Sequence, residues 1–122
     1  MVITYSRVQN GKIPPPVRDY IAHRLYHHQD YLNDYETARQ ELEQHKGNGT
    51  SAGDVVFWGE MVRAVSTAIE KRALFRELYT LHYEQRLSGA ETAARLGVSV
   101  ATFNKLRRGL IQCAGSNMGI LW

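Results

Sequence analysis

The chain has little cysteine and no long apolar run, and each of these absences excludes a class of protein. Its 122 residues include one cysteine, Cys113, so no disulfide can form within the chain and a reducing, cytoplasmic setting is expected. No stretch approaches the roughly 20 apolar residues that a membrane helix needs. The first residues lack the apolar run of a signal peptide. We therefore expect a cytoplasmic protein with no membrane partner.

Sequence signatures of catalysis and of bound cofactors are also missing. The chain has no Gly-rich phosphate loop and no serine nucleophile elbow. His23 and His27 have the i, i+4 spacing of paired metal ligands on a helix, but no fixed trio of cysteines or carboxylates accompanies them. We therefore expect no enzyme, no cofactor and no metal site.

Acidic residues are absent from the last quarter of the chain. Residues 29–91 hold eleven acids and seven bases, which gives the middle of the chain a negative charge. Residues 92–122 hold no Asp or Glu and four bases, namely Arg95, Lys105, Arg107 and Arg108. The modest net charge of +3 therefore hides a basic C-terminal end. Binding to nucleic-acid phosphates depends on such a local concentration of charge.

Residues 87–110, LSGAETAARLGVSVATFNKLRRGL, carry the most informative local pattern. Ser88 followed by Glu91 fits a capping box, which predicts that a helix starts at Gly89. Gly97 suits a turn with left-handed backbone. Ser99 predicts the cap of a second helix. Two tightly crossed helices joined in this way form a helix-turn-helix.

The second helix of this motif, expected over residues 100–110, is polar and basic on one face. Phe103, Leu106 and Leu110 recur at helical spacing and are expected to face inward. The opposite face would enter a DNA major groove, while a solvated helical hairpin that binds no DNA is the alternative. Base edges are expected near Thr102, Asn104 and Lys105 and phosphate near Arg107 or Arg108, within a full contact set of Ser99, Val100, Ala101, Thr102, Asn104, Lys105, Arg107 and Arg108.

The N-terminal half predicts long helices. Residues 1–16 are expected to form a flexible arm, followed by a helix over residues 17–45. Its inward positions form a heptad seam with steps of four and three: Ile21, Leu25, His28, Leu32, Tyr35, Arg39 and Leu42. The seam suits a coiled-coil dimer, or packing along a second helix over residues 54–73 after a Gly-rich loop at 46–53. We favour the intramolecular hairpin.

The rest of the chain also reads as helical, so the predicted fold class is all-α, a long N-terminal helical hairpin followed by a C-terminal helix-turn-helix. A helix over residues 74–86 should support that motif. Residues 113–122 form an apolar tail that docks on the core or on a partner chain. The inward stripe of the second long helix is expected to be Val55, Trp58, Met61, Val62, Val65, Ala68, Ile69 and Arg72. The expected divisions are the arm 1–16, the hairpin 17–73, the DNA-binding domain 74–112 and the tail 113–122.

Two segments carry a family resemblance. LFRELYTLHYEQRLSGAETAARLGVSVATFNKLRRGL, residues 74–110, resembles region 4 of sigma factors and its phage relatives. VRDYIAHRLYHHQDYLNDYETARQELEQ, with the Gly-rich loop and the second long helix, resembles the first half of RinA/ArpU-type phage transcriptional regulators. Leu32, Tyr35 and Glu41-Leu42 are the loose counterpart of that family's N-terminal pattern. The chain departs from the commoner pattern at Val100-Ala101, where Arg or Lys often follows the cap.

This resemblance implies a sequence-specific DNA-binding regulator, encoded by a phage or prophage, that activates late or packaging genes at a promoter in a bacterial host cell. Double-stranded DNA is the expected partner, and RNA polymerase and a homodimer through residues 17–45 are further candidates. The recognition positions that the resemblance implies are Ser99, Val100, Ala101, Thr102, Asn104, Lys105 and Arg108. The alternatives are a Q-type antiterminator, another protein that binds RNA polymerase or a sigma factor, and a small terminase-like subunit for DNA packaging.

Overall fold

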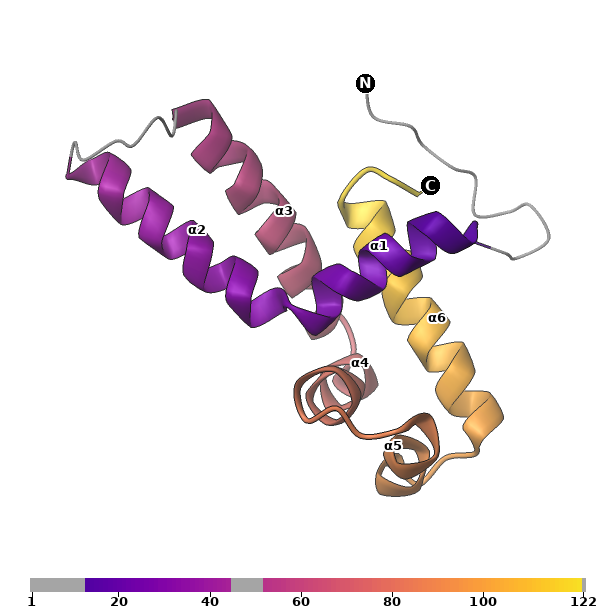
Figure 1. Ribbon diagram of the computed structural model, residues 1–122. Coiled ribbons are helices and arrows are strands. Elements are labelled where there is room, and N and C mark those ends of the chain that lie inside the picture. Colours follow the sequence, from indigo (N-terminus) through magenta and orange to yellow (C-terminus); the bar gives the residue numbers. More distant parts are fainter. Residues whose placement is uncertain (1–12, 45–51, 122) are drawn as a thin grey trace.

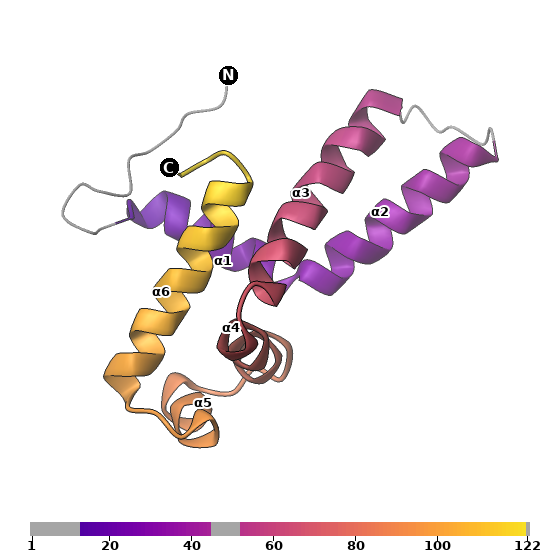
Figure 2. The same cartoon turned by 180° about the vertical axis from the view of Figure 1, so that it is seen from behind.

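The fold is all-helical over residues 13–44 and 52–121, which are the residues that the structure, a computed structural model, describes. Figures 1 and 2 show α2 and α3 side by side as an arm, with α1 and α6 beyond it and α4 and α5 below. The all-α prediction is confirmed for this part of the chain. The elements are α1 (Pro15–Tyr26), α2 (His28–Glu43), α3 (Ala52–Glu70), α4 (Ala73–Leu78), η1 (Tyr79–Glu84), α5 (Gly89–Leu96) and α6 (Val100–Asn117).

A break at His27 divides the region predicted as one helix over residues 17–45. His27 has φ −112° and ψ 20°, which is outside the α-helical region. Its N–H still reaches the carbonyl oxygen of His23 at 3.0 Å, so the chain bends without losing that hydrogen bond. The bend lets α1 pack on α6 and η1 while α2 packs on α3. The prediction of one continuous helix was wrong because contacts distant in sequence set the direction of each half.

The expected heptad seam holds through α1 and weakens in α2. Its first three positions are buried, ending with His28 at 4% exposure. Ala38 is the only other buried residue of α2. Arg39, predicted to face inward, instead pairs at the surface with Glu36 at 2.9 Å and with Glu43 at 2.8 Å. This prediction was wrong because a guanidinium flanked by carboxylates on its own helix keeps both its ion pairs and its hydration there.

Helix α3 carries the predicted apolar stripe, with two errors. Trp58 is 43% exposed, and its neighbour Phe57 is 54% exposed, because this end of α3 lies beside α2 alone (Figure 1). Arg72 is exposed and lies outside α3, since its φ of −138° is extended backbone that precedes α4. The buried members of the stripe are Val55, Val62, Val65, Ala68 and Ile69.

Helices α4 and η1 replace the single helix predicted for residues 74–86. η1 is a π-helix, in which hydrogen bonds span five residues and each turn is wider than in an α-helix. The rings of Tyr79 and Tyr83 therefore stack with centroids 6.3 Å apart, and both residues are buried. Tyr83 also meets the ring of Tyr26 in α1 at 4.7 Å, so the wide turn packs two large rings into the core.

Helix α6 continues to Asn117, beyond the expected end at residue 110 and into the segment predicted as a tail. A Cβ at Gly115 would lie 2.6 Å from Leu121 and 2.8 Å from Ile21, so only glycine allows these side chains to approach so closely. The chain then turns back, and the N–H of Leu121 bonds to the carbonyl oxygen of Gly115 at 3.1 Å. Leu121 is 2% exposed, so this end of the chain docks on its own core. Trp122, the residues 1–12 of the expected arm and residues 46–51 of the expected loop lie outside the described part.

Candidate nucleic-acid interface

Helix α5 begins with the capping box that the sequence predicts. The hydroxyl of Ser88 accepts a hydrogen bond from the backbone N–H of Glu91 at 3.1 Å. The carboxylate of Glu91 accepts one in return from the N–H of Ser88 at 3.4 Å. Thr92, fully buried, donates its hydroxyl to the carbonyl oxygen of Ser88 at 2.8 Å. These bonds fix the start of α5 at Gly89, as predicted.

A tight turn at Gly97 connects α5 to α6. Gly97 has φ 71°, the left-handed region where glycine carries no steric cost. The N–H of Val98 reaches back to the carbonyl oxygen of Ala93 at 3.0 Å, and Val98 packs partly buried against the core. Ser99 then caps α6 by accepting a hydrogen bond from the N–H of Thr102 at 3.1 Å. The turn and both caps confirm the local prediction for residues 88–99.

The inner face of α6 anchors this pair of helices to the core. Phe103 is 3% exposed, and its ring lies 5.1 Å from the ring of His82 in η1. Its ring edge also lies 2.9 Å from where a Cβ on Gly89 would be, so α5 and α6 touch at this point. Leu110 is fully buried and Leu106 is partly buried. The three predicted inward positions therefore face the core.

The outer face of α6 carries most of the residues predicted to contact DNA. Asn104 and Arg107 are half-buried at its edges. Val100 is 50% exposed, which leaves an apolar side chain in water at the first turn of the helix. The exposed members of the predicted set are Ser99, Val100, Ala101, Thr102, Lys105 and Arg108. Four of these six side chains are polar or basic, and Val100 and Ala101 add two exposed apolar groups at the start of α6.

Arg107 differs from Arg108 in its surroundings. Burial lowers the pKa of His82, its hydrogen bond to Leu87 raises it, and the charge of Arg107 lowers it further. Arg107 also acts on the pKa of Tyr83, which burial raises. Arg107 is therefore turned toward η1, whereas Arg108 is exposed. Of the two predicted phosphate contacts, Arg108 has the freer side chain.

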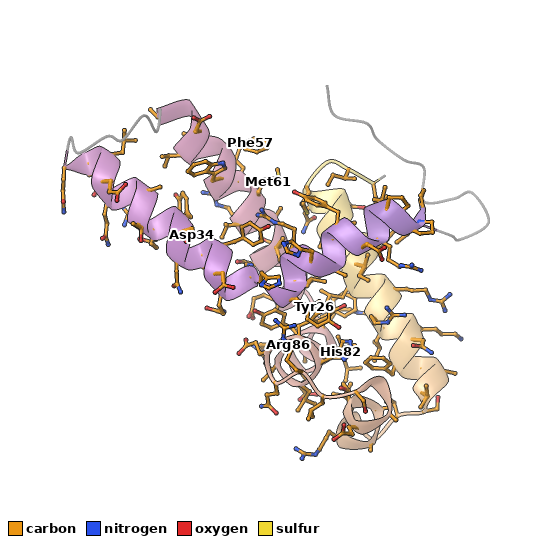
Figure 3. All side chains as sticks on the ribbon, in the orientation of Figure 1. Tyr26, Asp34, Phe57, Met61, His82 and Arg86 are labelled. Carbon is orange, nitrogen blue, oxygen red and sulfur yellow. The ribbon has the colours of Figure 1, made fainter. Side chains whose placement is uncertain are left out.

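A cluster at the end of α1 holds η1 in place, and no sequence pattern predicted it. The hydroxyl of Tyr26 lies 3.2 Å from Nε2 of His82, whose Nδ1 donates to the carbonyl oxygen of Leu87 at 2.8 Å. Arg86, with φ 60°, donates to the carbonyl oxygen of Tyr26 at 3.1 Å and covers its ring at 4.6 Å. Figure 3 shows Tyr26, His82 and Arg86 gathered at this junction. The partners are 56 and 60 residues apart, too far for periodicity to relate them.

His23 in α1 and His27 at the break after it do not build a larger cluster in the part of the chain that the structure describes. The rings of His23 and His27 have centroids 4.5 Å apart. Within residues 13–44 and 52–121, no group of three or more His, Cys, Asp or Glu side chains could hold a metal ion. No helix in the same ranges is both long and apolar enough to cross a bilayer.

Comparison with known proteins identified no relative of the chain. No family model, no curated protein and no solved structure matches the chain.

Proposed function

We propose that the chain is a sequence-specific DNA-binding transcription regulator whose recognition helix is the first half of α6. One observation carries the proposal. The exposed face at the start of α6 carries Thr102, Lys105 and Arg108 beside two small apolar residues, and it follows a turn defined by both serine caps and the left-handed Gly97. A preorganised helix with such a face is what a major groove admits.

The proposed docking treats α5 and α6 as a helix-turn-helix. The N-terminal end of α6 enters the groove, and Thr102, Asn104 and Lys105 reach base edges. Arg108 binds a phosphate, and the N-terminus of α5 faces the backbone with its free N–H groups. Because the chain has no acid after Glu91, no carboxylate on α6 repels the phosphates.

The biological role follows from the resemblance to RinA/ArpU-type regulators and to sigma region 4. The chain would bind a promoter of phage or prophage late genes in a bacterial host and recruit or modify RNA polymerase. α2 and the N-terminal half of α3, which extend beyond the region where α3 packs on α6 (Figure 2), would serve as the platform for a second copy or for polymerase.

A salt series of fluorescence anisotropy measurements tests the proposal. The duplexes are those selected from a random pool by the full chain, with scrambled versions as controls. We expect Lys105→Ala with Arg108→Ala to weaken binding and to reduce the slope of log K against log salt by about two. The matched control is Arg63→Ala with Lys71→Ala, which removes the same charge from exposed positions at α3 and after it. Equal loss in both double variants, or no loss in the first, contradicts the proposal.

The exposed aromatic end of α3 favours a second candidate, a protein that binds RNA polymerase or a sigma factor, as a Q-type antiterminator does. Val56 and Phe57 are 61% and 54% exposed near the N-terminal end of α3, which lies apart from the first half of α6 (Figure 1). Exposed apolar side chains of this kind are typical of protein contacts. Capture of purified polymerase that Phe57→Ser abolishes and Lys105→Ala with Arg108→Ala leaves unchanged would favour this candidate.

A further inference from the structure

A cavity between α2 and α3 is lined by aromatic rings and by one buried arginine. Its volume is about 250 Å³, and its walls are Arg24, Tyr31, Asp34, Tyr35, Trp58 and Val62. Asp34 on α2 and Phe57 on α3, close to Trp58 in sequence, mark the two helices that enclose it (Figure 3). The outer face of α6 contributes nothing to it, so the cavity is separate from the proposed DNA surface.

Arg24 is the unusual member of this lining. The residue is 8% exposed, and the Cζ of its guanidinium lies over the ring of Tyr31, 3.7 Å from the ring centroid. Its Nε is buried without a hydrogen-bond partner. Among the described residues no carboxylate forms an ion pair with it and no acceptor bonds to it. A guanidinium has five donors, and a buried charge without an acceptor is costly, so a bound anion would stabilise this arrangement.

The other lining residues indicate which further chemical groups a ligand of this cavity would carry. Tyr35 and Trp58 offer flat apolar surface, and Val62 is 5% exposed at the wall. Asp34 is exposed and has no ion pair within the described ranges, so it places a negative charge at the edge of the same cavity. A simple monoanion would bind Arg24 but would be repelled by Asp34. A molecule that carries one negative and one positive charge could pair with Arg24 and Asp34 together.

The cavity is also of suitable size. An apolar cavity of about 150 Å³ holds benzene in a well-studied case, so 250 Å³ leaves room for a ring and a short charged head. Ligand sites commonly combine apolar walls with a few polar groups that fix orientation.

We propose that this cavity binds a small zwitterion with an apolar body, such as an aromatic α-amino acid, through Arg24 to the carboxylate and Asp34 to the ammonium group. Tyr35 and Trp58 hold the side chain. The site is independent of the proposed DNA function, because none of its residues belongs to α5 or α6.

Three matched probes test the proposal on the full chain: L-phenylalanine, 3-phenylpropionate, which lacks the ammonium group, and phenethylamine, which lacks the carboxylate. Trp58 reports binding by fluorescence once Trp122→Phe has removed the other tryptophan, and calorimetry gives affinities. We expect roughly millimolar binding of L-phenylalanine, as is usual for so small a ligand, and a rise in Tm of several degrees at saturation. We expect weaker binding of 3-phenylpropionate and none of phenethylamine.

Two variants tie binding to the site. Arg24→Met should fold well, since an apolar side chain replaces an unpaired buried charge, and should weaken binding by roughly tenfold or more. Val62→Phe fills the cavity, keeps Arg24 and should also abolish binding. Phe57→Ala, an exposed aromatic outside the lining, is the control and should bind as the parent does. No binding of L-phenylalanine, equal binding of 3-phenylpropionate, or unchanged binding by Arg24→Met and Val62→Phe would each overturn the proposal.

Discussion

The two pairs of consecutive helices, α5–α6 and α2–α3, are held together in different ways. α5 and α6 each start with a serine cap, and Gly97 sets the turn between them. α2 has no side-chain hydrogen bond at its N-cap, and only two of its residues are buried, His28 and Ala38. The first pair is therefore defined by short-range bonds and a shared core, and the second by contact along one flank of α3.

This difference has a consequence for function. A surface that reads DNA must keep its side chains in a fixed geometry, and α6 has five buried residues to hold it. α2 has only two buried residues, whereas α3 has seven, so α2 should open at lower free energy than the core. The α2 side of the arm is accordingly suited to accommodate a ligand or partner, and α5 and α6 to present a fixed face.

The largest difference between the two helix pairs should be in the free energy of unfolding that is lost when a leucine is truncated to alanine. Leu110 in α6 is fully buried, and Leu110→Ala should cost about 2–5 kcal/mol of the free energy of unfolding. Leu42, near the end of α2, is only partly buried, and Leu42→Ala should cost less than Leu110→Ala, about 1–2 kcal/mol, since part of its surface already meets water. Denaturant unfolding of both variants measures the difference. Equal losses would mean that the arm is packed as firmly as the core.

The second expected effect is a dependence of stability on pH through His28, at the base of the arm where α2 begins. Burial, and then the charge of Arg24, lowers the pKa of His28 from 6.5 to about 4. Its Nε2 lies 3.0 Å from the hydroxyl of Ser66, which joins α2 to α3. Because the unfolded chain takes up a proton on His28 below pH 6.5 and the folded chain does not, stability should fall between pH 6.5 and pH 4, by up to about 3 kcal/mol.

Unfolding of His28→Gln across this pH range tests that expectation. The variant keeps a polar partner for Ser66 and removes the titrating group, so its stability should depend less steeply on pH. His82, whose pKa is also lowered, remains in both proteins and supplies the residual slope. His23→Gln, at an exposed position of α1, is the control and should follow the parent. A parent-like slope in His28→Gln would show that the base of the arm does not sense pH.

Removal of a cap should have a smaller effect, confined to the α5–α6 pair. Ser88→Ala deletes the hydroxyl that accepts from the N–H of Glu91, and should cost about 1 kcal/mol. Thr37→Ala removes an exposed hydroxyl from the interior of α2 and should change stability by less than about 0.5 kcal/mol. Thermal unfolding of both variants gives the comparison, and a larger loss for Thr37→Ala would reverse it.

Features of the α5–α6 pair could be predicted because their causes lie within a few residues of one another. Ser88 bonds to Glu91 and Ser99 to Thr102, so each cap forms between two residues that are three positions apart in the sequence. The left-handed turn at Gly97 is likewise local. The outward face of α6 followed from its period alone. Sequence reasoning therefore succeeded where the bonds are short in sequence.

Apart from Arg39, which pairs with carboxylates on its own helix, the main errors fall where distant contacts decide the conformation. The break at His27 and the π-helix at η1 depend on Tyr26 meeting His82 and Tyr83, more than 50 residues away. Helix α6 runs past residue 110 because Gly115 admits Ile21 and Leu121, and the glycine alone suggested a loop. The cavity was also missed, since no pattern relates Arg24 on α1 to Trp58 on α3.

The smallest expected effect is at the surface of the arm. The hydrogen bond that Arg39 donates to Glu36, and then the charges of Glu36 and Glu43, raise the pKa of Arg39, which is protonated at neutral pH in either case. Exposed ion pairs within one helix gain little, because water screens the charges and two long side chains lose freedom. Arg39→Ala should therefore leave Tm almost unchanged at both low and high salt. Arg76→Ala, which breaks a more exposed pair with Glu70 between α4 and α3, is the control. A fall in Tm of several degrees in Arg39→Ala but not in Arg76→Ala, present at low salt and absent at high salt, would contradict this. It would show that surface ion pairs, rather than its few buried residues, hold α2 in place.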